Sequence, residues 1–131
     1  MKFKPHHVAL TVNNMEETVE WYKNNLGFKV THDYGKYGAK KILLQLDEVR
    51  LELFDFDKEN QPLPDYRKDL MEDIHVVGTK HLCIEVEDLD VLVQDLKQKG
   101  IETRKIDTAG FGGRFTFIKD NNGILIEFYQ K

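Results

Sequence analysis

The feature that most constrains the fold of this chain is an internal repeat, because repeated segments build repeated structural units. One copy begins with HVALTV and closes with RLELFDF, and the other begins with HLCIEV and closes with LIEFYQ. His7 and His81 are 74 positions apart, and Glu52 and Glu127 are 75 apart, so the copies keep nearly the same register. We therefore expect two modules with the same order of helices and strands.

Each copy predicts the order βαβββ. Alternating apolar and β-branched residues indicate the strands. Apolar residues spaced by three and four, between an Asn or Asp cap and a glycine, indicate the helices. The expected elements are strands 6–12, 28–34, 40–46 and 49–56 with a helix over 15–26, and strands 81–86, 102–106, 114–119 and 124–129 with a helix that starts at Leu89 and is ended by Gly100.

The fold class is therefore α+β, in one domain over residues 1–131. Module 1 covers about 4–56 and module 2 about 81–131. A polar linker over about 57–80 joins them, and we expect a short helix in it near 65–73.

Two histidines and two glutamates occupy equivalent positions in the copies. Since strand side chains alternate between faces, His7 and His81 lie on the face opposite the fully apolar one, which packs under the helix. Glu52 and Glu127 each lie between two apolar residues, where a carboxylate is costly to bury unless it is paired or bound to a metal. If the modules pack about a pseudo-twofold axis, the four side chains converge. They would suit one divalent ion of Zn, Ni, Co, Mn or Fe.

Single residues of this set have simpler explanations. A glutamate can face solvent from a half-exposed strand, and a lone histidine is more often structural than a ligand. His6 is the main alternative to His7, because a shift of one position would exchange their faces. His32 has no counterpart in the second copy, and His75 lies in the linker, where solvent exposure explains it.

Composition excludes several classes of partner. Lys plus Arg number 19 against 23 Asp plus Glu, for a net charge of −4, so we expect no nucleic-acid binding and no membrane association. The N-terminal MKFKPHHVALTV has too short an apolar run for a signal peptide. Cys83 is the one cysteine, so no intrachain disulfide can form and a cytoplasmic location is expected.

Longer motifs carry a family resemblance. The segments are HHVALTV, WYKNNLGFKV, VRLELF, KHLCIEVEDLD and GRFTFIKDNNGILIEFY, in a paired βαβββ layout that covers nearly the whole chain. This sequence resembles the vicinal oxygen chelate superfamily (glyoxalase I, bleomycin resistance proteins and dioxygenases), and most closely small bacterial glyoxalase I-like proteins. The resemblance implies a cup-shaped, barrel-like mixed sheet around a metal with open coordination sites. His7, Glu52, His81 and Glu127 match the family's ligands.

The resemblance also implies a reaction. It favours a glyoxalase I-like (lactoylglutathione lyase-type) lyase or isomerase that moves a proton on an α-hydroxycarbonyl, such as a thiol hemithioacetal. Glu127 is the expected catalytic base and Glu52 the alternative. Glyoxalase I usually has an Arg early in the first helix region to hold glutathione, but residues 13–17 read NNMEE. Open alternatives are a methylmalonyl-CoA epimerase-like enzyme, a fosfomycin thiol transferase, and a binding protein without turnover.

Two further expectations concern the surroundings of the site. A fosfomycin transferase needs a cationic pocket, for which Arg114 and Lys119 are the nearby basic candidates. We also expect a homodimer, because sheet edges need covering and small relatives usually pair; the metal site could form within one chain or between two. The expected substrate-pocket residues are Arg114, Phe54, Phe117 and Tyr129.

Overall fold

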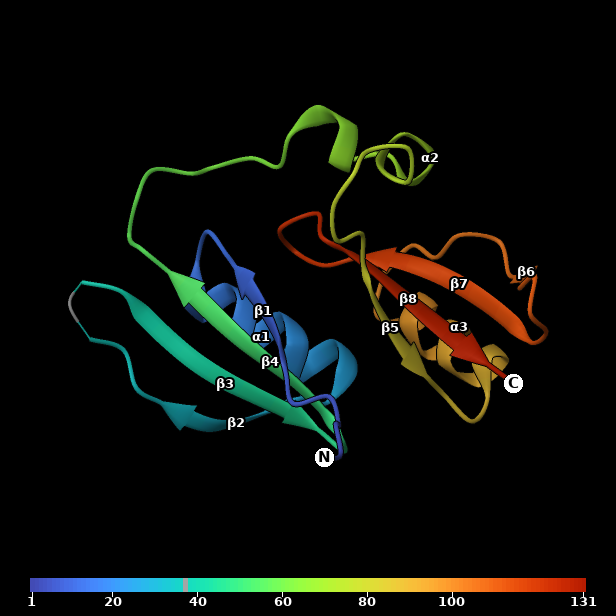
Figure 1. Cartoon of the computed structure of the whole chain (residues 1–131), viewed down its shortest axis with the longest axis horizontal. Helices are drawn as coiled ribbons and strands as arrows, with labels where there is room; N and C mark the ends of the chain where they lie inside the picture. The colour runs from blue at the N-terminus through green and yellow to red at the C-terminus, as the bar shows by residue number, and fades with distance from the viewer. Residues whose placement is uncertain (37) are drawn as a thin grey trace. The chain divides into compact units, whose positions relative to one another are not determined.

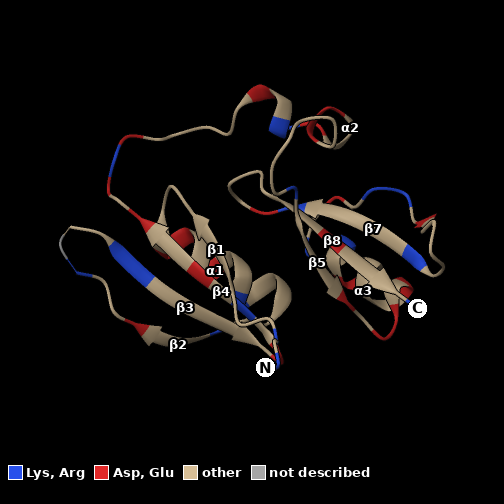
Figure 2. Ribbon diagram, viewed as in Figure 1, with Lys and Arg blue, Asp and Glu red and all other residues tan. Residues whose placement is uncertain are grey.

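A computed structural model describes residues 1–36 and 38–131, and it confirms the α+β class and the paired modules (Figure 1). The chain forms two compact units, residues 1–62 and 63–131. Each unit holds a four-stranded mixed sheet. Acidic and basic residues are interspersed along both units (Figure 2).

The first unit follows the predicted order closely. Its sheet has the strand order β1-β4-β3-β2, with β1 parallel to β4 and the other pairs antiparallel. The elements are β1 (Val8–Thr11), α1 (Met15–Leu26), β2 (Lys29–Asp33), β3 (Lys40–Leu46) and β4 (Val49–Asp55).

Helix α1 begins and ends as the sequence predicts. The Asn14 side chain accepts a hydrogen bond from the backbone N–H of Glu17, and Gly27 ends the helix in the left-handed conformation at φ 86°. The helix packs on β3 and β4. Met15 and Tyr22 on its inner face are almost fully buried, and so are Leu44, Leu51 and Leu53 of the sheet.

The second unit repeats this arrangement after a short helical segment. Its sheet has the order β5-β8-β7-β6, again with the first pair parallel. α3 packs on β8, and the expected linker helix is present as η1 and α2. The elements are η1 (Asp65–Arg67), α2 (Leu70–Asp73), β5 (Leu82–Glu85), α3 (Leu89–Gln98), β6 (Asp107–Thr108), β7 (Arg114–Lys119) and β8 (Leu125–Gln130).

The strand predicted over 102–106 is wrong. The regular pairing with β7 is confined to β6, at residues 107–108. Upstream, Arg104 donates one backbone hydrogen bond to Phe117, but its carbonyl accepts from the Thr116 hydroxyl at 2.6 Å. Because a side chain takes the place of a backbone partner there, the ladder does not extend.

Each helix is also tied to the end of the last strand of its unit. Asp55 accepts a hydrogen bond from the backbone N–H of Met15 at 3.0 Å, and Gln130 accepts one from Leu89 at 2.9 Å. Asp55 and Gln130 are 75 positions apart, as Glu52 and Glu127 are. The same tie therefore positions the helix against the strand that carries the glutamate.

Among the described residues, no helix is long and apolar enough to cross a membrane.

Candidate metal-binding residues and their surroundings

Glu52 lies on the face of the first sheet that α1 does not cover. Its neighbours in the sheet are Ala9 on β1 and Leu43 on β3, whereas Leu51 and Leu53 point to the helix side and are fully buried. His7 directly precedes β1. Its Nε2 is 3.5 Å from Oε1 of Glu52, and the Glu52 side chain is 23% exposed. The first unit thus brings one predicted imidazole and one predicted carboxylate together.

A tyrosine completes the surroundings of Glu52. The hydroxyl of Tyr34, just after β2, donates a hydrogen bond to Oε2 of Glu52. Burial raises the pKa of Tyr34 to about 12, and its contact with Glu52 acts in the same direction. The phenol therefore stays protonated and remains a donor throughout the neutral range. Each oxygen of Glu52 faces a partner, His7 on one side and Tyr34 on the other.

His6 contacts His7 directly. The Nδ1 atoms of the two rings are 2.8 Å apart, so one ring donates and the other accepts. The imidazole of His7 that faces Glu52 is thereby held through its other nitrogen. Metal-binding histidines are commonly oriented in this way by an outer partner.

The second unit brings His81 and Glu127 together. Nε2 of His81 is 2.9 Å from Oε2 of Glu127, and the side chains are 20% and 16% exposed. Glu127 is flanked in the sheet by Cys83 on β5 and Phe117 on β7. The ring of Phe117 packs edge-on against His81 with centroids 4.8 Å apart. This pair is more buried than the pair in the first unit.

Cys83 is a weak neighbour of Glu127. Its thiol hydrogen-bonds that carboxylate, and burial together with the charge of Glu127 raises the pKa of the thiol to about 11. A thiol is a poor hydrogen-bond donor and, when protonated, a poor nucleophile. Cys83 therefore holds Glu127 less firmly than Tyr34 holds Glu52.

The donor chemistry of the two pairs fits a divalent transition metal. Each pair offers one imidazole nitrogen and one carboxylate oxygen, the donors that Zn, Ni, Co, Mn and Fe share. Nδ1 of His81 is buried and has no hydrogen-bond partner among the described residues. Within residues 1–36 and 38–131, no group of three or more His, Cys, Asp or Glu side chains gathers closely enough to hold a metal. The four-ligand set therefore stays a prediction.

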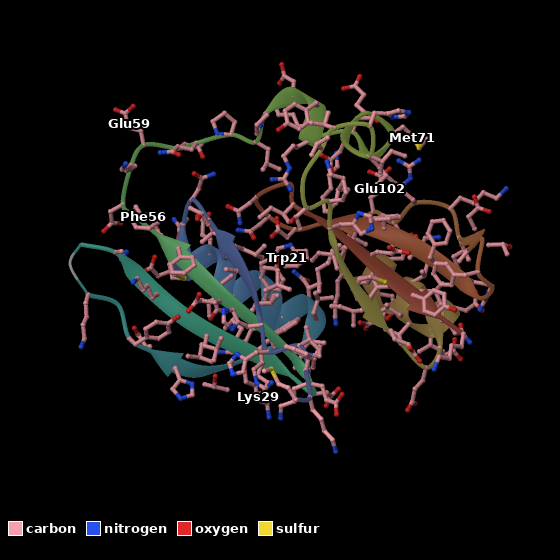
Figure 3. The ribbon with its side chains drawn as sticks, viewed as in Figure 1. Trp21, Lys29, Phe56, Glu59, Met71 and Glu102 are labelled. Atoms are coloured by element: carbon pink, nitrogen blue, oxygen red, sulfur yellow. The ribbon has the colours of Figure 1, made fainter. Side chains whose placement is uncertain are left out.

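The predicted pocket residues divide between the two faces of their sheets. Phe54 shares the face of Glu52 and stacks on Phe56, labelled in Figure 3, with ring centroids 6.3 Å apart. Phe117 and Tyr129 share the face of Glu127, since strand positions two apart point the same way.

Arg114 lies on the opposite, helix-covered side of its sheet. It forms an ion pair with Asp90 of α3 at 2.8 Å and a hydrogen bond with Gln130 at 2.9 Å. The hydrogen bond from Arg114 holds the pKa of Asp90 below its ordinary value. The guanidinium is therefore used within the fold, on the side away from Glu127.

The remaining histidines make local contacts. Nδ1 of His32 is 3.1 Å from the Thr31 hydroxyl, and Nδ1 of His75 is 2.6 Å from the backbone oxygen of Met71. Both contacts are exposed, and neither histidine belongs to a His–Glu pair among the described ion pairs.

Comparisons with known proteins show the family of this chain. The sequence profile of the Glyoxalase/Bleomycin resistance protein/Dioxygenase superfamily matches residues 4–128. Uncharacterized protein YwkD of Bacillus subtilis is 35% identical over 130 residues, covering 96% of this chain and 95% of its own. The ethylmalonyl-CoA/methylmalonyl-CoA epimerase of Cereibacter sphaeroides is 30% identical, covering 95% and 96%.

A solved structure is similar over the same extent. The glyoxalase family protein from Enterococcus faecalis has a TM-score of 0.80 and 29% sequence identity, covering 96% of each chain. The likeness in sequence and in structure therefore spans both units.

Proposed function

Since the chain belongs to the Glyoxalase/Bleomycin resistance protein/Dioxygenase superfamily, we propose that it is a metal-dependent enzyme that moves a proton at the carbon beside a carbonyl group. The observation that carries this proposal is the pair of His–Glu contacts at repeat-equivalent positions, His7 with Glu52 and His81 with Glu127. The four side chains would hold one divalent ion.

The protein's own groups have separate roles in this proposal. A bound divalent ion would polarise the substrate carbonyl and stabilise the negative oxygen of the enolate. Glu127 removes the proton beside that carbonyl and returns it, as a positioned carboxylate can. Phe117 packs on His81 and lies opposite Glu127 in the sheet, where its ring covers one side of the pair.

The surroundings of the two glutamates favour Glu127 as the base. The hydroxyl of Tyr34 donates a hydrogen bond to Glu52, which restricts how far that carboxylate can turn toward a substrate. Glu127 has His81 on one side and only the weak thiol donor of Cys83 nearby. We assign proton transfer to Glu127 and a fixed ligand role to Glu52.

Two substrate classes follow from this chemistry. A 2-carboxyacyl-CoA thioester is the first candidate, supported by the 30% identical epimerase, whose match covers 95% of this chain, and by the lack of Arg in residues 13–17. A glyoxalase I-type hemithioacetal is the second, supported by the likeness of the GRFTFIKDNNGILIEFY segment to glyoxalase I-like proteins. Fosfomycin transfer has weaker support, because Arg114, one of its two expected cations, is bound to Asp90 and only Lys119 stays without a carboxylate partner among the described residues.

Exchange of the substrate proton with deuterium tests the proposal. The protein loaded with each of Zn, Ni, Co, Mn and Fe is incubated in deuterated water with methylmalonyl-CoA, and separately with methylglyoxal and several thiols. Mass spectrometry then follows uptake of deuterium at the carbon beside the carbonyl. Absence of metal-dependent uptake with every substrate would contradict the proposal.

Matched variants separate the roles of the two glutamates. Glu127→Gln should abolish uptake while metal stays bound, because an amide oxygen can still coordinate but cannot take the proton. Glu52→Gln should slow uptake only modestly. Glu85→Gln, on the exposed end of β5, is the control. If Glu127→Gln exchanges at the wild-type rate and Glu52→Gln does not, the roles are reversed.

The same proposal covers location and assembly. We propose a cytoplasmic protein, supported by its single cysteine, and a homodimer, supported by the need to cover sheet edges.

A further inference from the structure

A pocket of about 220 Å³ lies within the second unit, at the outer edge of its sheet. The segment after α3, the end of β7 and the start of α2 surround it, and Figure 3 labels Glu102 and Met71 in these segments. Its lining residues are Lys68, Asp69, Leu70, Glu102, Thr103, Arg104, Phe117, Ile118, Lys119 and Leu125.

The pocket adjoins the His81–Glu127 pair. Phe117 lines the pocket and also packs against His81, with ring centroids 4.8 Å apart. Phe117 lies opposite Glu127 in the sheet, and Lys119 lies opposite Leu125. A molecule held at His81 and Glu127 could therefore extend past one aromatic ring into the pocket.

The floor and the rim of the pocket differ in chemistry. Leu70, Phe117 and Leu125 are buried and form one apolar cluster. The rim carries cations, and Figure 2 shows basic residues along the segment between α3 and β6. This combination suits a ligand with an apolar or amide-bearing arm and an anionic end.

The rim cations differ in how far their charge is already compensated. Arg104 has no side-chain hydrogen bond or ion pair among the described residues, and Lys119 donates to a backbone oxygen, that of Lys68, at 2.6 Å. Neither charge is neutralised by a carboxylate in the described part of the chain. Asp69, by contrast, is occupied as the cap of α2, where it accepts from two backbone N–H groups. Glu102 is the opposing charge at the rim.

We propose that this pocket binds the pantetheine arm and the phosphates of a coenzyme A thioester, with Arg104 and Lys119 facing the phosphates. This inference rests on the proposed function, in which an acyl-CoA is the first candidate substrate. It adds the residues that would distinguish a CoA ester from a shorter thioester. Since the rim is exposed, its attraction for phosphate should weaken as salt rises.

Binding of free coenzyme A, measured by calorimetry on the metal-loaded protein, tests the inference without turnover. Arg104→Glu should weaken binding about tenfold, and Glu102→Gln should strengthen it about twofold, as expected for charges at an exposed rim. Lys97→Glu, which makes the same charge change on α3, is the control and should leave binding within about twofold of wild type. Equal effects of Arg104→Glu and Lys97→Glu, or no binding of coenzyme A to the wild type, would overturn the inference.

Two comparisons sharpen the test. ADP has phosphates but no pantetheine arm, so ADP binding as tight as that of coenzyme A would contradict the role of the apolar floor. In turnover, Arg104→Glu should raise KM for methylmalonyl-CoA about tenfold. The same variant should leave KM for the N-acetylcysteamine thioester unchanged, because that substrate has no phosphates. Equal changes in KM for both substrates would also contradict the role of the pocket. Failure of deuterium uptake by the wild type would refute the proposed reaction alone, since binding is measured separately.

Discussion

Replacement of Tyr34 by Phe should weaken metal binding without unfolding the protein. The change removes the hydroxyl that donates to Glu52, while the ring remains. A hydrogen bond to a charged group contributes about 1.5–3 kcal/mol, but Tyr34 is 37% exposed, so we expect about 1 kcal/mol. That corresponds to a loss of metal affinity of about fivefold. The effect arises because Glu52 gains freedom that metal binding must then remove.

Competition with a chromophoric chelator measures this change in affinity for Zn, Ni and Co. Tyr66→Phe is the matched control, because Tyr66 is 41% exposed and its hydroxyl makes no hydrogen bond within residues 1–36 and 38–131. Circular dichroism during urea unfolding checks that both variants fold equally well. Metal affinity of Tyr34→Phe within about twofold of the Tyr66→Phe value would refute the reasoning.

Three further predictions concern stability, reactivity and assembly. Asp55→Ala should lower the free energy of unfolding by about 1–3 kcal/mol in urea titration, because the buried Asp55 holds the first N–H of α1. Glu20→Ala, which removes an exposed ion pair with Lys23 on the same helix, should cost less than about 0.5 kcal/mol, and equal losses would contradict this. Cys83 should react with iodoacetamide at pH 8 at less than about a tenth of the rate of free cysteine. The reason is that a raised pKa of about 11 keeps the thiol protonated until the pH rises well above 9. A reaction rate equal to that of free cysteine would contradict this prediction. Light scattering at micromolar concentration should show a dimer, and a monomer would refute that expectation.

Much of the fold could be predicted because it depends on local patterns that occur twice. The caps at Asn14 and Asp88, and the glycine after Asn121-Asn122 with φ 83°, follow from neighbouring residues alone. The strand over 102–106 was predicted wrongly because local sequence does not reveal that the distant Thr116 hydroxyl takes the carbonyl of Arg104.

The candidate site was predictable to a different extent. Strand alternation and the repeat predict the face on which each histidine and glutamate lies, but the contacts of His7 with Glu52 and of His81 with Glu127 depend on the parallel pairing of β1 with β4 and of β5 with β8. Tyr34 was missed because it has no repeat counterpart and meets Glu52 only through the pairing of β2, β3 and β4.

For Arg114 the sequence did contain a signal. It lies three positions before Phe117 on one strand, and an odd spacing places two strand residues on opposite faces. Alternation alone could therefore have separated it from the face of Glu127.

Metal content is the most direct test of the central claim, that His7, Glu52, His81 and Glu127 together hold one divalent ion. Elemental analysis after reconstitution and gel filtration should give about one metal per chain for the wild type. His7→Ala and His81→Ala should each reduce the metal content to a small fraction of the wild-type value. His75→Ala, outside both His–Glu pairs, should leave the metal content unchanged. Metal content unaffected by His81→Ala, or lost only when His7 is replaced, would contradict the assignment of all four ligands to one ion.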